Sequence, residues 1–71
     1  MNSVLVIEDD PEILENIEEI LELQSYQALT TSSSLRGLQL AKETLPSLVI
    51  CEVVMPELDG YGVLSELRQQ A

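Results

Sequence analysis

The chain has 71 residues, of which 45% are hydrophobic, and a formal charge of −10 from 13 acidic and three basic side chains. This length allows one domain, taken as residues 1–71, and the hydrophobic fraction excludes a disordered segment, while the charge disfavours nucleic acids and anionic membranes as partners. A single cysteine excludes an internal disulfide, and no apolar run approaches the ~18 residues of a membrane span, so we expect a soluble, cytoplasmic protein.

The first expected element is a strand over residues 3–7, Ser-Val-Leu-Val-Ile, which is continuous in apolar, β-branched side chains. It ends in Glu8, Asp9 and Asp10, and Pro11 suits the first turn of a following helix with Asp10 as its N-cap. Apolar residues at helical spacing define the core face of this helix: Ile13, Leu14, Ile17, Ile20 and Leu21. Its other face carries five glutamates, which we interpret as a solvated face or, alternatively, as a docking face for a basic partner.

The middle of the chain predicts an edge strand over residues 26–31, because its alternation is poor and its polarity higher. Ser32 to Ser34 offer N-caps for a helix over residues 35–45. Along this helix, Leu35, Leu38 and Ala41 or Lys42 form one stripe, expected to face the core. Gly37 lies inside the helix, where glycine is about 1 kcal/mol less favourable than alanine, and therefore indicates close packing on the sheet.

The third strand is predicted over residues 48–51, Leu-Val-Ile-Cys, whose unbroken apolar run is typical of a strand buried on both faces. It stops at Glu52, and a Met-Pro step and an Asp59-Gly60 turn follow. Tyr61, Val63, Leu64 and Leu67 then predict a short third helix. Cys51 lies within the apolar strand, which favours a small core residue over a reactive thiol.

This alternation of strands and helices predicts an α/β fold with a parallel sheet, and a second crossover that returns past the first strand gives the order 2-1-3. The first and third strands are then neighbours, so Glu8, Asp9 and Glu52 are expected at one edge of the sheet. Carboxylates this close either raise their pKa values or share a cation, and oxygen ligands suit Mg²⁺ better than zinc. The alternative is that these acids are solvated loop residues and helix caps.

Two stretches together resemble the receiver domain of two-component response regulators. They are residues 4–11, Val-Leu-Val-Ile-Glu-Asp-Asp-Pro, and residues 48–61, Leu-Val-Ile-Cys-Glu-Val-Val-Met-Pro-Glu-Leu-Asp-Gly-Tyr. The resemblance implies a flavodoxin-like fold in which an aspartate after the third strand accepts a phosphoryl group from a histidine kinase. Carried over, Glu52 stands at the phosphoacceptor position. Glu8, Asp9, Glu52 and the carbonyl of Val54 would hold Mg²⁺, weakly, with Asp9 as the more direct ligand of the acid pair.

The chain departs from that family in two ways. Its acceptor position holds glutamate, whose extra methylene displaces the carboxylate from in-line attack. The family has five strand and helix pairs, whereas this chain supplies three, so the hydroxyl residue of the fourth strand and the lysine of the fifth are missing. The expected fold is therefore a truncated receiver, (βα)₃, completed by dimerisation.

We interpret the chain as a pseudo-receiver, not an enzyme, which is not phosphorylated and acts by protein–protein association in signal transduction. One alternative is a phosphoryl-accepting receiver or phosphate sink with an unusual acceptor, and another is a non-functional or engineered fragment. The expected partners are a second copy of the chain and, alternatively, a histidine kinase or another signalling protein. The homodimer would form through the edge of the third strand, composed of Leu48, Val49, Ile50 and Cys51.

Overall fold

Three successive strand–helix units build the fold in a computed structural model that describes residues 2–70. The elements are β1 (Ser3–Ile7), α1 (Pro11–Leu23), β2 (Gln27–Thr31), α2 (Ser34–Thr44), β3 (Leu48–Cys51) and α3 (Gly60–Gln70). The sheet is parallel and has the order β2-β1-β3, which confirms the predicted fold class and topology. Across residues 2–70, no helix has both the length and the apolar character needed to cross a membrane.

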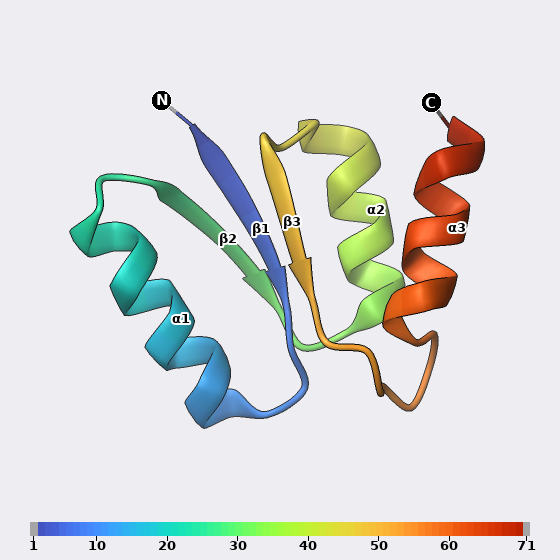
Figure 1. Cartoon of the computed structure of the whole chain (residues 1–71), viewed down its shortest axis with the longest axis horizontal. Coiled ribbons are helices and arrows are strands. Elements are labelled where there is room, and N and C mark those ends of the chain that lie inside the picture. The colour runs from blue at the N-terminus through green and yellow to red at the C-terminus, as the bar shows by residue number, and fades with distance from the viewer. Residues whose placement is uncertain (1, 71) are drawn as a thin grey trace.

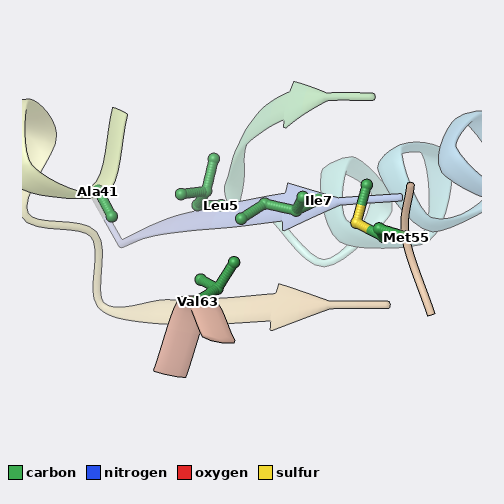
Figure 2. Close-up of a cluster of buried hydrophobic side chains, with 5 residues drawn as sticks. All are labelled: Leu5, Ile7, Ala41, Met55 and Val63. Atoms are coloured by element: carbon green, nitrogen blue, oxygen red, sulfur yellow. The ribbon is translucent and has the colours of Figure 1, made fainter. Parts of the chain in front are cut away.

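The helices cover the two faces of this sheet unequally. Figure 1 shows α1 on one side of the sheet and α2 with α3 on the other. Side chains alternate along β1, so Leu5 and Ile7 face the α2 side while Val4 and Val6 face α1. The main core therefore lies on the α2 side, where Leu5 and Ile7 meet Ala41, Met55 and Val63 (Figure 2).

Local capping chemistry places the helix ends close to the predicted positions. Asp10 is the N-cap of α1, because its Oδ1 accepts hydrogen bonds from the backbone N–H of Glu12 at 3.0 Å and of Ile13 at 3.3 Å. Ser33 caps α2 by accepting from the N–H of Arg36 at 3.2 Å. The helix ends one residue earlier than predicted because Leu45 takes a left-handed conformation, with φ of 48°.

The prediction that the third strand is buried on both faces is wrong. Leu48 is 55% exposed and the other residues of β3 are only half-buried. The reason is that only one face of β3, with Val49 and Cys51, packs against the core, whereas α1 packs on β1 and β2 and leaves the other face of β3 little covered within residues 2–70; β3 is also an edge of the described sheet. Similarly, α1 contains no fully buried residue, although its predicted core face includes the half-buried Leu14, Ile17 and Leu21.

The predicted core stripe of α2 is correct at Ala41, which lies in the core, is half-buried at Leu38 and is wrong at Leu35. Leu35 is 55% exposed, and the buried residues of α2 are Ser34, Gly37 and Ala41. Small residues face the sheet because the helix lies very close to it: a Cβ added at Gly37 would come within 2.6 Å of Ile7 Cγ1. The close packing predicted from Gly37 is thus confirmed, and it explains why leucines occupy the flank of this helix.

Candidate functional site

The carboxyl ends of β1 and β3 bring Glu8 and Glu52 side by side. The register pairs Ile7 with Cys51, so the next residue of each strand is one of these acids. The hydrogen-bond ladder continues into both: the N–H of Glu52 donates to the Ile7 carbonyl at 2.9 Å, and that of Glu8 donates to the Thr31 carbonyl at 3.2 Å. Both backbones are therefore fixed by the sheet, and the predicted meeting of the strand-end acids is a consequence of the 2-1-3 order.

Glu8 is the buried member of this site, with an exposed fraction of 6%. Its Oε2 accepts a hydrogen bond from the backbone N–H of Asp10 at 3.1 Å. Burial raises the pKa of the Glu8 carboxyl above its usual range, the Asp10 N–H lowers it, and the neighbouring carboxylates of Asp9 and Glu52 raise it further. The fold therefore holds one carboxyl where its charged form is disfavoured.

We predict that Glu8→Gln raises the thermal stability of the chain at pH 7. The raised pKa means that the folded state binds more protons than the unfolded state, so the free energy of unfolding falls as pH rises through the interval between the two pKa values. The neutral amide removes this loss and can still accept from Asp10. Melting curves from pH 3 to 8 should show an advantage that disappears below the ordinary glutamate pKa of about 4.3. Glu15→Gln, on the exposed face of α1, is the control. A difference in melting temperature between the wild type and Glu8→Gln that stays the same at every pH would contradict the prediction.

The half-buried side chain of Glu52 bends back onto its own loop. Its Oε1 accepts from the backbone N–H of Val53 at 2.9 Å and, at the longer distance of 3.5 Å, from that of Val54. These two amides form a small anion-binding turn, and the carboxylate of Glu52 occupies it. At least one of its oxygens is thus engaged within the chain.

The structure brings together only part of the predicted magnesium site. Glu8 interacts with both Asp9 and Glu52, while Asp9 and Val54 are exposed. However, over residues 2–70 no three or more His, Cys, Asp or Glu residues form a group that could hold a metal ion. As arranged, with Glu52 turned towards the loop amides, these carboxylates do not fit a cation, and the magnesium site stays a prediction.

Cys51 directly precedes Glu52 and packs against the hydrophobic core. Its Sγ lies 3.4 Å from the carbonyl oxygen of Glu52 and donates to it. Burial raises the pKa of the Cys51 thiol, and the carboxylates of Glu52, Glu8 and Asp59 raise it further. A protonated thiol is a poor nucleophile, which supports its interpretation as a core residue.

Sequence reasoning missed the contacts that hold the loop over residues 53–59. The Ser33 hydroxyl donates to Glu57 Oε1 at 2.7 Å, and the Ser34 Oγ accepts from the Leu58 N–H at 2.9 Å. Asp59 Oδ1 accepts from the Gly62 N–H at 2.8 Å and so caps α3, where only a turn was predicted. The run of serines indicated helix caps, but nothing in their spacing pointed to a loop 24 residues away.

The sheet order, the acids at the strand ends and the loop that follows them together match a known family. The sequence model of the response regulator receiver domain matches residues 4–71. The chain belongs to the response regulator receiver family. The "Probable transcriptional regulator ycf27" of Porphyra purpurea and the "Transcriptional regulatory protein KdpE" of Mycobacterium tuberculosis are each 38% identical to it over 68 residues. Those alignments cover 96% of this chain but only 28% and 30% of the two relatives.

Solved receiver structures share the architecture of this receiver chain. A response regulator receiver domain protein from Clostridium thermocellum is 37% identical, with a TM-score of 0.91, and matches all of this chain and 58% of its own. The response regulator protein TrrA from Thermotoga maritima, in complex with Mg²⁺-BeF, is 30% identical, with a TM-score of 0.93. It matches 99% of this chain and 61% of its own. The receiver chain thus spans a little over half of each solved structure.

Proposed function

We propose that this chain is a pseudo-receiver of two-component signalling, a receiver-type module that accepts no phosphoryl group and acts by protein–protein association in the cytoplasm. The observation that carries the proposal is the position of the Glu52 carboxylate. It lies at the place that the family resemblance assigns to the phosphoacceptor, and it is bonded to the N–H groups of Val53 and Val54. A carboxylate already held by amides of its own loop is a poor nucleophile for in-line attack.

The positions of the basic side chains support the same proposal. Phosphoryl transfer needs positive charge placed where the transferred group gains negative charge. Lys42 and Arg68 belong to the last turns of α2 and α3, at the helix ends remote from Glu52. Arg36, in the first turn of α2, directs its Nη1 to Gln39 Oε1 at 3.0 Å. None of the three bases in this sequence is thus committed to the acidic site.

We predict that acetyl phosphate with Mg²⁺ leaves the intact mass of the chain unchanged. The reason is the engaged carboxylate of Glu52, together with the fact that no basic side chain within residues 2–70 is directed to it. Intact-mass spectrometry at short reaction times measures the outcome directly. A gain of one phosphoryl group that Glu52→Gln abolishes would replace this proposal with its alternative, a phosphoryl-accepting receiver or phosphate sink.

Weak binding of Mg²⁺ is a second part of the proposal. Glu8, Asp9, Glu52 and the Val54 carbonyl would supply oxygen ligands once Glu52 left its amides, and the need for that movement implies low affinity. The Thermotoga relative, solved with Mg²⁺-BeF, supports this assignment by analogy. We predict millimolar rather than micromolar binding of Mn²⁺ in calorimetry, weakened by Asp9→Asn. Equal heats for the wild type and Asp9→Asn would mean that the cation binds elsewhere.

The proposed association uses the free edge of β3, with a second copy of the chain as the partner. Beside this edge lies a groove of about 210 Å³, lined by Val49, Cys51, Gly60, Val63, Leu64 and Leu67. An exposed strand edge with apolar side chains is a template for pairing with another strand. Antiparallel pairing of β3 with its own copy closes on itself about a two-fold axis and cannot propagate. A histidine kinase or another signalling protein remains the alternative partner for this module.

The position of α3 limits how two copies can meet. The helix α2 packs on β1 and β2, and α3 packs beside α2, so α3 extends over the groove next to β3. Packed helices lie about 8–10 Å apart, whereas paired strands lie about 4.8 Å apart. A two-fold β3 pair would therefore bring both α3 helices to the axis on one face. We infer that the dimer exchanges its α3 helices or moves them outward.

A further inference from the structure

The loop over residues 53–59 is held by contacts at its own ends, with the core and with α2. At its start, the carboxylate of Glu52 accepts from the N–H of Val53, as described above. Its two ends are joined, because the N–H of Gly60 donates to the Val53 carbonyl at 2.8 Å. Between them Met55 is buried in the core, with an exposed fraction of 8% (Figure 2). The loop is thus a closed unit rather than a loose connection between β3 and α3.

Its third attachment is the N-terminus of α2. Ser34 is fully buried, with an exposed fraction of 0%, and its Oγ accepts from the N–H of Leu58. A buried hydroxyl that satisfies a loop amide is costly to remove, because the amide is then left without a partner. Ser33 Oγ takes part in two contacts at once: it donates to Glu57 Oε1 and accepts from the Arg36 N–H as the cap of α2. A movement of the loop therefore disturbs the cap of the helix.

We propose that Ser33 and Ser34 couple the state of the acidic site at Glu52 to the N-terminus of α2. The inference rests on the proposed role of Glu52 as the centre of this site. A change at the Glu52 carboxylate frees the Val53 and Val54 amides, loosens the loop and, through Glu57 and Leu58, weakens the first turn of α2. In the opposite direction, a partner that binds at the start of α2 alters how firmly the loop holds Glu52. Coupling of this kind is reciprocal.

Amide hydrogen exchange by NMR on the 71-residue chain tests both directions. Glu52→Ala removes the carboxylate, and we expect about tenfold faster exchange at the Arg36 amide, the effect of losing one hydrogen bond of typical strength. Ser33→Ala should produce a similar increase at the amides of Val53 and Val54. In both variants the amides of β1 should exchange at wild-type rates, because the opening is local.

Matched variants separate coupling from a general loss of stability. Ser33→Thr retains the hydroxyl and should restore wild-type exchange at Val53 and Val54. Ser32→Ala changes the exposed serine next to the cap and should have no effect, and Glu15→Ala on α1 is the corresponding control for Glu52→Ala. The proposal is overturned if Glu52→Ala leaves the Arg36 amide unchanged. It is equally overturned if Ser33→Ala speeds exchange in β1 as much as in the loop.

The hydrogen-exchange experiment and the phosphorylation experiment can succeed or fail separately. If acetyl phosphate modifies Glu52 while the amides still respond as expected, the pseudo-receiver assignment fails and the coupling stands. If the mass is unchanged and the amides do not respond, the assignment stands and the coupling fails.

Discussion

Gly60→Ala should destabilise the chain by about 2 kcal/mol, the middle of the range for an overpacked site. Gly60 is the first residue of α3, and a Cβ there would lie 2.8 Å from the carbonyl oxygen of Glu52 and 3.0 Å from the Cα of Val53. Both are backbone atoms, so no side-chain rotation can relieve the contact. The helix would have to shift and lose the 2.8 Å hydrogen bond from the Gly60 N–H to the Val53 carbonyl.

Urea unfolding followed by far-ultraviolet circular dichroism measures this loss, with Gly62→Ala as the matched control. A Cβ at Gly62 would lie 2.5 Å from Cδ1 and 3.0 Å from Cγ of Leu58, so the crowding there involves the end of a half-buried side chain rather than backbone atoms. Alanine also gains about 1 kcal/mol over glycine within a helix, which offsets the crowding. Similar unfolding midpoints for Gly60→Ala and Gly62→Ala would show that α3 does not press on the backbone of the site.

Leu48→Lys should cause the largest change in the mass of the assembly in solution. We expect the wild-type chain to scatter light as a dimer of twice 7.9 kDa at micromolar concentration, and the variant to scatter as a folded monomer. Leu48 lies at the start of β3 and is 55% exposed, so lysine is tolerated in the single chain. In an antiparallel two-fold pair of β3 strands it would place one charge at each end of the seam, and charges on an edge strand oppose pairing.

Leu35→Lys is the control for this experiment, because Leu35 has the same exposed fraction of 55% but belongs to α2, away from the β3 edge. It should remain a dimer. A wild-type chain that is well folded at 7.9 kDa would remove the proposed dimer altogether, and dissociation by both lysine variants would mean that charge alone, not the β3 edge, decides assembly.

Patterns in the sequence predicted the sheet better than the helix surfaces. The apolar runs of β1 and β3 and their alternation with helices predicted a parallel sheet, and the order β2-β1-β3 followed once the second crossover was taken to return past the first strand. The α2 stripe was right at Ala41 but failed at Leu35, because apolar spacing predicts a leucine on the core face, whereas the first turn of a helix this close to the sheet has room only for small residues such as Ser34 and Gly37. Burial of β3 could not follow from its own composition, since it depends on which helices cover its two faces.

For the candidate site, the sequence predicted which acids meet but not how their side chains are oriented or what holds the loop. Its acids, Glu8 and Glu52, were found because strand ends in a parallel sheet meet at one edge. The orientation of these side chains could not be predicted, because the hydrogen bond from the Val53 N–H to the Glu52 carboxylate depends on the local loop conformation. The contacts of Ser33 with Glu57 and of Ser34 with Leu58 join segments 24 residues apart, and no local pattern encodes such pairs.

The central position of β1 has a consequence for the order of folding during synthesis. β1 pairs with both β2 and β3, and it precedes both in the chain. As the polypeptide leaves the ribosome, the strand that later strands need is therefore already present when each of them emerges. Residues 3–31 emerge before β3 does and can pair first, so each new strand adds to an existing edge. Vectorial synthesis thus shortens the search for partners, which parallel sheets otherwise make slow.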